Sequence, residues 1–176
     1  PREYQRQAFE NWKANGQQGL FAMATGTGKT ITSLNCLLEI YKRTGYYKAI
    51  ILVPTITLVN QWESECRKFN FNTILKVSGS NSEWREELGS IKASEQLDTT
   101  GKSVSYVIIC TYASFAKPAV FDKLNSLSRN RLLLIADEAH NMGSRQLMKK
   151  LGDITYYRRI GLSATPERQY DATGNN

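Results

Sequence analysis

A glycine-rich segment near the start of the chain has the residue types that bind phosphate. Residues 23–30 read MATGTGKT, between a short apolar run at 20–24 and residues with helical spacing. Two glycines allow backbone N–H groups to converge on phosphate oxygens, and a helix N-terminus adds about half a positive charge there. In such loops the lysine reaches the β- and γ-phosphates, and the next hydroxyl ligates Mg²⁺. The predicted nucleotide-binding loop residues are Thr25, Gly26, Thr27, Gly28, Lys29 and Thr30.

The sequence also offers an alternative to this phosphate-binding loop, and a second glycine–lysine run. Met23 stands where the strict phosphate-loop pattern has its first glycine, so a glycine-rich turn with an exposed lysine is the alternative. The order of strand, loop and helix favours the phosphate site over that turn. Residues 100–103 (TGKS) contain a similar run, but they precede a strand-like segment and open no helix, so we interpret them as a turn.

Two adjacent carboxylates follow the apolar run at 132–136. In phosphate-loop enzymes a carboxylate at a neighbouring strand end completes the Mg²⁺ site, usually through water, and Asp137 is the candidate here. Glu138 is then placed to orient and deprotonate an attacking water. Asp137 would also serve as a helix N-cap, and the pair alone leaves that alternative open. With the loop, the pattern favours a catalytic set of Lys29, Asp137 and Glu138.

Strand-like and helix-like segments alternate along the chain. The apolar runs at 49–53 and 132–136 are typical of strands buried on both faces, as in parallel sheets. The other expected strands lie at 20–24, 73–77, 104–110 and 156–162. Helical spacing appears at 2–13, 31–41, 58–69, 82–98, 112–127 (interrupted by Pro118) and 146–151. The alternation predicts an α/β domain with a mainly parallel central sheet and helices on both faces, whose ligands bind at the carboxyl ends of the strands.

Composition narrows the class of protein further. The formal net charge of +7 favours an anionic partner such as nucleic acid, although many domains are mildly basic. No apolar run reaches the ~18 residues of a membrane span. The three cysteines are odd in number, lie among apolar neighbours, and are far in sequence from the single histidine, His140. We therefore expect buried free thiols in a reducing compartment and no zinc site.

Residues 137–140 read DEAH, and with them the chain resembles the first RecA-like domain of superfamily 2 helicases and translocases. Further family motifs occur in the same order: REYQ at 2–5, the loop at 24–30, VPT at 53–55 followed by QW at 61–62, TY at 111–112, and SAT at 163–165. The resemblance covers about residues 1–168. The strings at 53–62 and 161–168 are most similar to XPB-type helicases and to motor subunits of type I and type III restriction enzymes.

The resemblance implies a role for each motif. Gln5 would hydrogen-bond adenine, which favours ATP with Mg²⁺ as the cofactor pair. Thr55 and Thr111, and with them Gly79, would contact the phosphates of a nucleic-acid strand, most often double-stranded DNA in these relatives. His140, Ser163 and Thr165 would link the γ-phosphate to that surface.

Several of these residues have simpler explanations. Gln5 would also suit an amphipathic helix, and Thr55 and Thr111 would also serve as helix N-caps. Trp62 falls on the apolar period of its helix, so we expect it in the core rather than stacked on a base. RNA remains an alternative substrate, because RNA helicases share the DEAH string.

The family resemblance also implies how the domain is used. Residues 1–169 are expected to form one RecA-like domain, with 170–176 a polar tail toward a second RecA-like domain that would supply arginine fingers. An arginine finger contributes roughly 10³–10⁵ in rate in related enzymes, so we expect little turnover from residues 1–176 alone. The expected location is the cytoplasm, or the nucleoid or nucleus with DNA. The competing functions are a DNA helicase or translocase, an ATP-dependent clamp or switch, and a small-molecule kinase.

Overall fold

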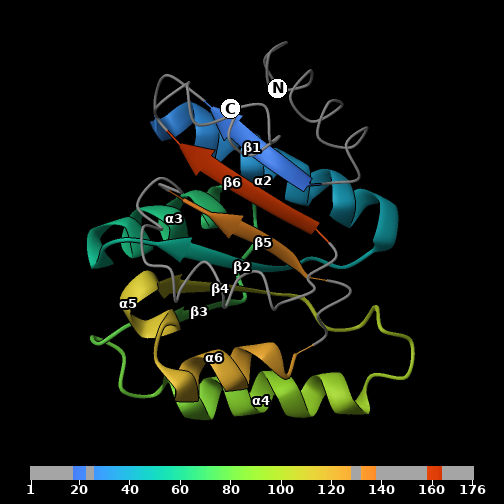
Figure 1. Ribbon diagram of the computed structural model, residues 1–176. Helices are drawn as coiled ribbons and strands as arrows, with labels where there is room; N and C mark the ends of the chain where they lie inside the picture. The colour runs from blue at the N-terminus through green and yellow to red at the C-terminus, as the bar shows by residue number, and fades with distance from the viewer. Residues whose placement is uncertain (1–17, 23–25, 128–131, 138–157, 164–176) are drawn as a thin grey trace.

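The computed structural model describes residues 18–22, 26–127, 132–137 and 158–163, giving the backbone alone at 18–22, 26–27 and 158–163. Within these ranges no helix has the length and apolar character needed to cross a membrane. The helices expected at 2–13 and 146–151 lie outside the described residues, as does the polar tail. Strands and helices otherwise alternate as the sequence predicts (Figure 1).

Six parallel strands among the described residues form one sheet. They are β1 (Gln18–Ala22), β2 (Lys48–Val53), β3 (Ile74–Val77), β4 (Tyr106–Thr111), β5 (Leu133–Ala136) and β6 (Arg158–Ser163). Their order across the sheet is β1-β6-β5-β2-β4-β3, and every neighbouring pair is parallel. All carboxyl ends therefore meet at one edge of the sheet, which we call the carboxyl edge. The opposite edge is the amino edge.

Helices cover both faces of this sheet, as predicted. They are α2 (Gly26–Thr44), α3 (Ile56–Lys68), α4 (Trp84–Leu97), α5 (Tyr112–Phe115) and α6 (Pro118–Asn125). Alternation along β2 divides the core: Ala49, Ile51 and Val53 pack toward α2 and α3. Ile50 and Leu52 pack toward the face covered by α4, α5 and α6. Figure 1 shows α4 and α6 side by side on that second face.

Local signals in the sequence explain where the helices stop. Gly45 follows α2 with φ of +87°, a conformation that favours glycine, and its N–H bonds to Tyr41 O at 2.8 Å. Pro118 occupies the first turn of α6, where its missing N–H costs nothing, so the expected helix at 112–127 is two helices. The first strand, expected at 20–24, lies at 18–22.

All three cysteines are buried free thiols, as expected. Burial, with a smaller contribution from Glu63, raises the pKa of Cys66 to about 12. Burial also raises the pKa values of Cys36 and Cys110, with Glu39 adding to the effect at Cys36. These thiols act as small apolar side chains of the core.

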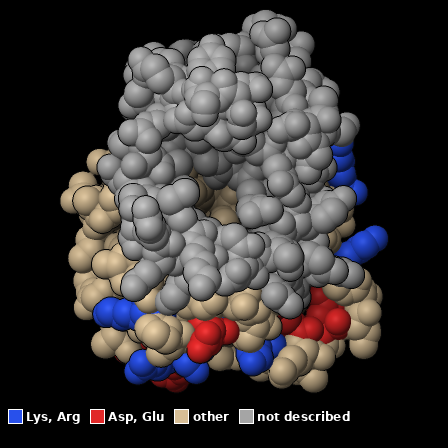
Figure 2. Space-filling view, viewed as in Figure 1, with Lys and Arg blue, Asp and Glu red and all other residues tan. Residues whose placement is uncertain are grey.

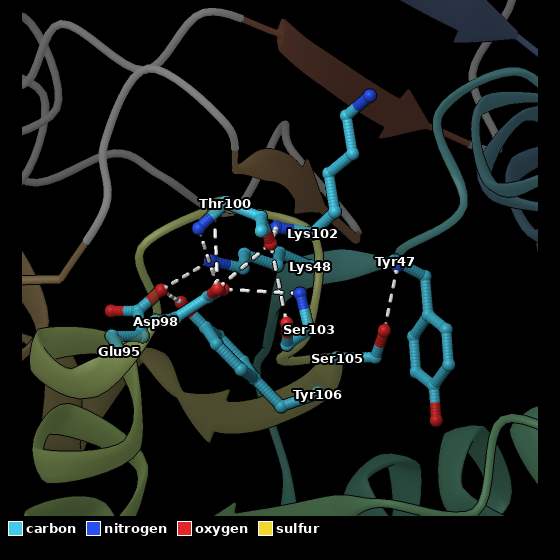
Figure 3. Close-up of polar contacts among 10 residues, drawn as sticks. Tyr47, Lys48, Glu95, Asp98, Thr100, Lys102, Ser103, Ser105 and Tyr106 are labelled. Atoms are coloured by element: carbon cyan, nitrogen blue, oxygen red, sulfur yellow. Dashed lines mark hydrogen bonds and ion pairs between the residues drawn. The ribbon is translucent and has the colours of Figure 1, made fainter.

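A buried ion pair holds α4 against the amino edge (Figure 3). Lys48 Nζ lies 2.6 Å from Glu95 Oε2, and the two side chains are 2% and 7% exposed. The Tyr106 hydroxyl donates to the same oxygen at 2.9 Å. Lys48 Nζ also lies 5.6 Å and 5.7 Å from the ring centres of Tyr46 and Tyr106. Both charges therefore have close partners on rigid elements.

The TGKS segment closes on a single carboxylate beside this pair, as Figure 3 also shows. Asp98 accepts hydrogen bonds from the backbone N–H groups of Thr100 (3.1 Å), Gly101 (3.1 Å) and Ser103 (3.1 Å). Gly101 has φ of +73°, which favours glycine. The segment leads into β4 and opens no helix, which confirms that it is a turn.

Candidate functional site

The phosphate-loop lysine lies at the start of α2, at the carboxyl edge. The helix begins at Gly26, so the N–H groups of Gly26, Thr27 and Gly28 belong to its first turn, where helices bind anions. Thr32 and Ser33 are fully buried on this helix, and their hydroxyls donate to Gly28 O and Lys29 O, each at 2.8 Å. The buried hydroxyls of Thr32 and Ser33 are therefore paired with carbonyl groups of the first turn of the same helix.

Lys29 and Asp137 meet, although they are far apart in sequence. Lys29 Nζ lies 3.1 Å from Asp137 Oδ1, and the side chains are 3% and 2% exposed. Asp137 directly follows β5, and its N–H donates to Leu52 O on β2 at 2.8 Å. Two buried charges need close partners to offset their lost hydration. The structure thus brings the lysine of the loop and the first carboxylate of the DEAH string into one site.

Two aromatic side chains fix Asp137 from neighbouring helices. Trp62 Nε1 on α3 donates to Asp137 Oδ2 at 2.8 Å, and the Tyr112 hydroxyl on α5 donates to the backbone carbonyl of Asp137 at 2.8 Å. Trp62 is 1% exposed, which confirms that it belongs to the core. Neither bond follows from the spacing of the sequence motifs. A buried indole N–H or phenol requires a polar partner, and that requirement was the available signal.

The oxygen groups present fit a magnesium ion. Mg²⁺ prefers oxygen ligands, and the site offers the Asp137 carboxylate and the hydroxyl of Thr30, the residue after Lys29. Among the residues that the structure describes there is no cluster of three or more His, Cys, Asp or Glu side chains.

The two candidate threonines for nucleic acid are both helix N-caps at the carboxyl edge. Thr55 Oγ1 accepts from Leu58 N–H at 3.2 Å, and its side chain is exposed. Thr111 Oγ1 accepts from Ser114 N–H at 3.2 Å, and Thr111 is 6% exposed. Capping is thus confirmed for both. A contact with a nucleic-acid strand stays a prediction, and the exposure of Thr55 suits it better.

Gly79 lies on the surface, after β3, which is an outermost strand of the described sheet. A Cβ added there would meet no heavy atom within 4 Å. Beside it lies a groove of about 280 Å³, lined by Val59, Asn60, Ile74, Lys76, Ser78, Ser80, Asn81 and Glu87. Neither packing nor backbone conformation requires glycine at position 79, which leaves its proposed contact as a prediction.

For the remaining predicted site residues the structure describes no side chain. Gln5, Thr25, Glu138, His140 and Thr165 lie outside the described residues. For Thr27 and Ser163 the backbone alone is described, with Ser163 at the carboxyl end of β6 beside Ala22 of β1. Among described residues on the face shown in Figure 2, basic and acidic side chains are interspersed.

The parallel sheet and the Lys29–Asp137 site define a RecA-like α/β domain of the kind that begins superfamily 2 helicases. The family model described as "Type III restriction enzyme, res subunit" matches residues 1–168, and the chain belongs to that family.

Individual relatives agree with this assignment. A protein named as helicase 22 of Sulfolobus islandicus filamentous virus is 32% identical over 96% of this chain and 28% of its own length. The "DNA 3'-5' translocase XPB2" of Sulfurisphaera tokodaii is 29% identical over 95% of this chain and 31% of its own length. The chain thus spans under a third of the length of these relatives.

Solved structures share the fold. A nuclease-deletion mutant of the Type ISP restriction-modification enzyme LlaGI, in complex with a DNA substrate mimic, superimposes with a TM-score of 0.69. It is 24% identical, and the match covers 94% of this chain and 17% of that one. The UvsW helicase from Bacteriophage T4 gives a TM-score of 0.64 at 16% identity, with 95% of this chain and 53% of that chain covered.

Proposed function

We propose that this chain is the ATP-binding motor domain of a DNA helicase or double-stranded DNA translocase of the restriction or repair type. The observation that carries the proposal is the buried contact between Lys29 and Asp137 at the carboxyl edge. It unites the phosphate loop with the DEAH carboxylate where parallel α/β sheets bind ligands. Family membership and the named activity of the translocase relative support the same function.

Each site residue has a defined task in this proposal. Lys29 would contact the β- and γ-phosphates of ATP in place of Asp137, and Asp137 and the Thr30 hydroxyl would hold Mg²⁺, Asp137 through water. Bound Mg²⁺ neutralises charge that develops on the phosphates. Glu138 orients and deprotonates the attacking water. The N–H groups at the start of α2, from Gly26 onward, bind the phosphate oxygens.

The remaining predicted residues select the nucleotide and couple it to nucleic acid. Gln5 selects adenine, and the loop residues Thr25, Thr27 and Gly28 contact phosphate. Thr55, Thr111 and Gly79 contact the nucleic-acid backbone, most often of duplex DNA. His140, Ser163 and Thr165 link the γ-phosphate to that surface. The support for these roles is the match of residues 1–168 to the family.

A second RecA-like domain of the same protein completes the site in this proposal. Residues 1–169 form the first domain, and the segment 170–176 leads toward the second. The short share of the relatives' length that this chain covers supports such an arrangement. Residues 1–176 alone should therefore bind nucleotide weakly and turn it over slowly.

The test is ATP turnover by the whole protein with duplex DNA, single-stranded DNA or RNA. We expect strong stimulation by duplex DNA and its loss in Glu138→Gln. Stimulation by RNA alone would retain the motor and overturn the DNA assignment. ATP binding without turnover on any polymer would instead indicate a clamp or switch.

A further inference from the structure

The carboxylate of Asp137 has a different partner on each oxygen. Oδ1 lies 3.1 Å from Lys29 Nζ, and Oδ2 accepts the indole N–H of Trp62 at 2.8 Å. A hydrogen bond to an ionised acceptor is roughly twice as strong as one between neutral groups. The Trp62 bond therefore restrains the carboxylate on the side away from Lys29.

Trp62 is itself held rigidly. It is 1% exposed on α3 and packs in the core cluster that includes Val59, Cys66 and Phe71. A large ring in a close-packed core cannot rotate without disturbing its neighbours. Its N–H therefore has a fixed position and direction relative to the sheet.

The backbone of Asp137 is also fixed, by the bonds to Leu52 O and from the Tyr112 hydroxyl. What remains adjustable is the rotation of the carboxylate about its own side-chain bonds. The Trp62 N–H restrains that rotation, so that Oδ1 faces the phosphate-loop lysine. Under the proposed function Lys29 transfers to phosphate, and this restraint persists after Lys29 has moved.

We propose that Trp62 is a positioning residue, which holds Asp137 Oδ2 so that the carboxylate is oriented for Mg²⁺ before nucleotide arrives. The inference rests on the proposed function and deepens it. Outer residues that orient metal ligands typically contribute 10–100-fold to metal affinity. Loss of the indole N–H should therefore weaken the Mg²⁺-dependent part of nucleotide binding and spare the Mg²⁺-independent part.

The experiment compares Trp62→Phe with the unmutated whole protein by isothermal titration calorimetry. ADP affinity is measured with Mg²⁺ and with chelator in its place. In the unmutated protein Mg²⁺ should tighten ADP binding. Trp62→Phe should reduce that gain by up to about 10-fold, the low end for outer residues, because Asp137 holds the ion through water. The matched control is Phe71→Leu, which shrinks a buried aromatic residue of the same cluster without touching Asp137 and should keep the full gain.

Two further variants test the route through Asp137. Trp62→His retains a ring N–H and should recover part of the Mg²⁺ gain. In an Asp137→Asn background, Trp62→Phe should change the gain no further, because interacting residues give non-additive effects. An additive loss in that background, or a histidine variant as defective as phenylalanine, would overturn the positioning role.

The outcomes separate this inference from the proposed function. If the unmutated protein binds no nucleotide, or gains nothing from Mg²⁺, the proposed function fails and the role of Trp62 fails with it. If the unmutated protein shows the gain and Trp62→Phe keeps it, the Trp62 role alone is overturned.

A measurement on unmutated protein covers the case in which the Trp62 variants do not fold. With ¹⁵N-tryptophan label, an indole N–H signal should move when Mg²⁺ is added to the ADP complex. Indole signals that all stay in place would contradict the inference.

Discussion

The two edges of the sheet each contain a buried lysine–carboxylate pair. At the carboxyl edge Lys29 meets Asp137 at 3.1 Å, and at the amino edge Lys48 meets Glu95 at 2.6 Å. All four side chains are less than a tenth exposed. The chemistry of the two pairs is the same, so their different surroundings must give them different roles.

The surroundings differ in what adjoins the lysine. Lys48 lies on a strand, near two tyrosine rings, and Glu95 has the Tyr106 hydroxyl as a second partner. Lys29 lies in the first turn of α2, where a helix attracts anions. In the proposed function, a phosphate bound there would compete with Asp137 for Lys29. The amino-edge pair therefore fastens α4, whereas the proposed function requires the carboxyl-edge pair to exchange partners.

The two glycine–lysine–hydroxyl runs follow the same division. Gly28, Lys29 and Thr30 lie inside a helix that starts at the carboxyl edge, whereas residues 101–103 lie in a turn closed on Asp98 at the amino edge. The tripeptide alone does not define a phosphate site. Its position relative to the ends of parallel strands distinguishes the run proposed to bind phosphate from the turn.

The largest expected effect is on turnover at the carboxyl edge. In the proposed function Lys29 stabilises the transferring phosphoryl group, so Lys29→Met should lower nucleic-acid-stimulated ATP turnover of the whole protein about 10²–10³-fold. Lys48→Met is the control, and below its unfolding temperature it should retain turnover. Equal losses in the two variants would remove the functional distinction between the pairs.

The next effect concerns stability at the amino edge. Lys48→Met leaves Glu95 buried without its counter-charge, and breaking such a pair costs about 3–5 kcal/mol. Denaturant titration should show this loss. In the double variant with Lys48→Met, Glu95→Gln keeps an acceptor for the Tyr106 hydroxyl and removes the unpaired charge. The double variant should therefore recover most of the lost free energy of unfolding. A double variant no more stable than Lys48→Met would contradict the charge explanation.

A smaller effect separates the two possible roles of Thr55. Thr55→Ala removes the N-cap of α3 and should lower the free energy of unfolding by about 1 kcal/mol. Thr55→Asp retains a capping oxygen but adds negative charge, so stability should hold while duplex DNA binding weakens. Fluorescence anisotropy with labelled duplex measures the binding. Unchanged affinity for Thr55→Asp would leave Thr55 as a cap without a phosphate contact.

The smallest effect is the pH dependence of the amino-edge turn. Slight desolvation raises the pKa of Asp98, but hydrogen bonds from Ser103 and Thr100 outweigh it and lower the pKa to about 2. A carboxyl group with a depressed pKa in the folded state stabilises above its unfolded value, near 3.9, and loses that contribution as pH falls toward 2. At pH 6 the wild-type protein should therefore have a higher melting temperature than Asp98→Asn. The difference between the two melting temperatures should disappear near pH 2–3. A constant difference would exclude the carboxylate as the cause.

Local sequence patterns were sufficient to predict most of the strands and helices. The apolar runs at 49–53 and 132–136 identified central strands, because strands covered on both faces need apolar residues throughout. Gly45 and Pro118 marked helix boundaries through backbone geometry. The bond between Trp62 and Asp137 joins residues far apart in sequence, and nothing in the spacing of either motif encodes it.

The position of β1 has a consequence for the order in which the domain is assembled. β1, which ends at Ala22, is an outermost strand of the described sheet. Its one neighbour among the described strands is β6, which begins at Arg158. During synthesis the strand that leads into the phosphate loop must therefore wait for the last strand. Such distant pairings make folding slow and leave an early strand unpaired on the nascent chain. A ribosome halted before residue 158 would carry strands β2 to β5 without the partner that joins β1 to them.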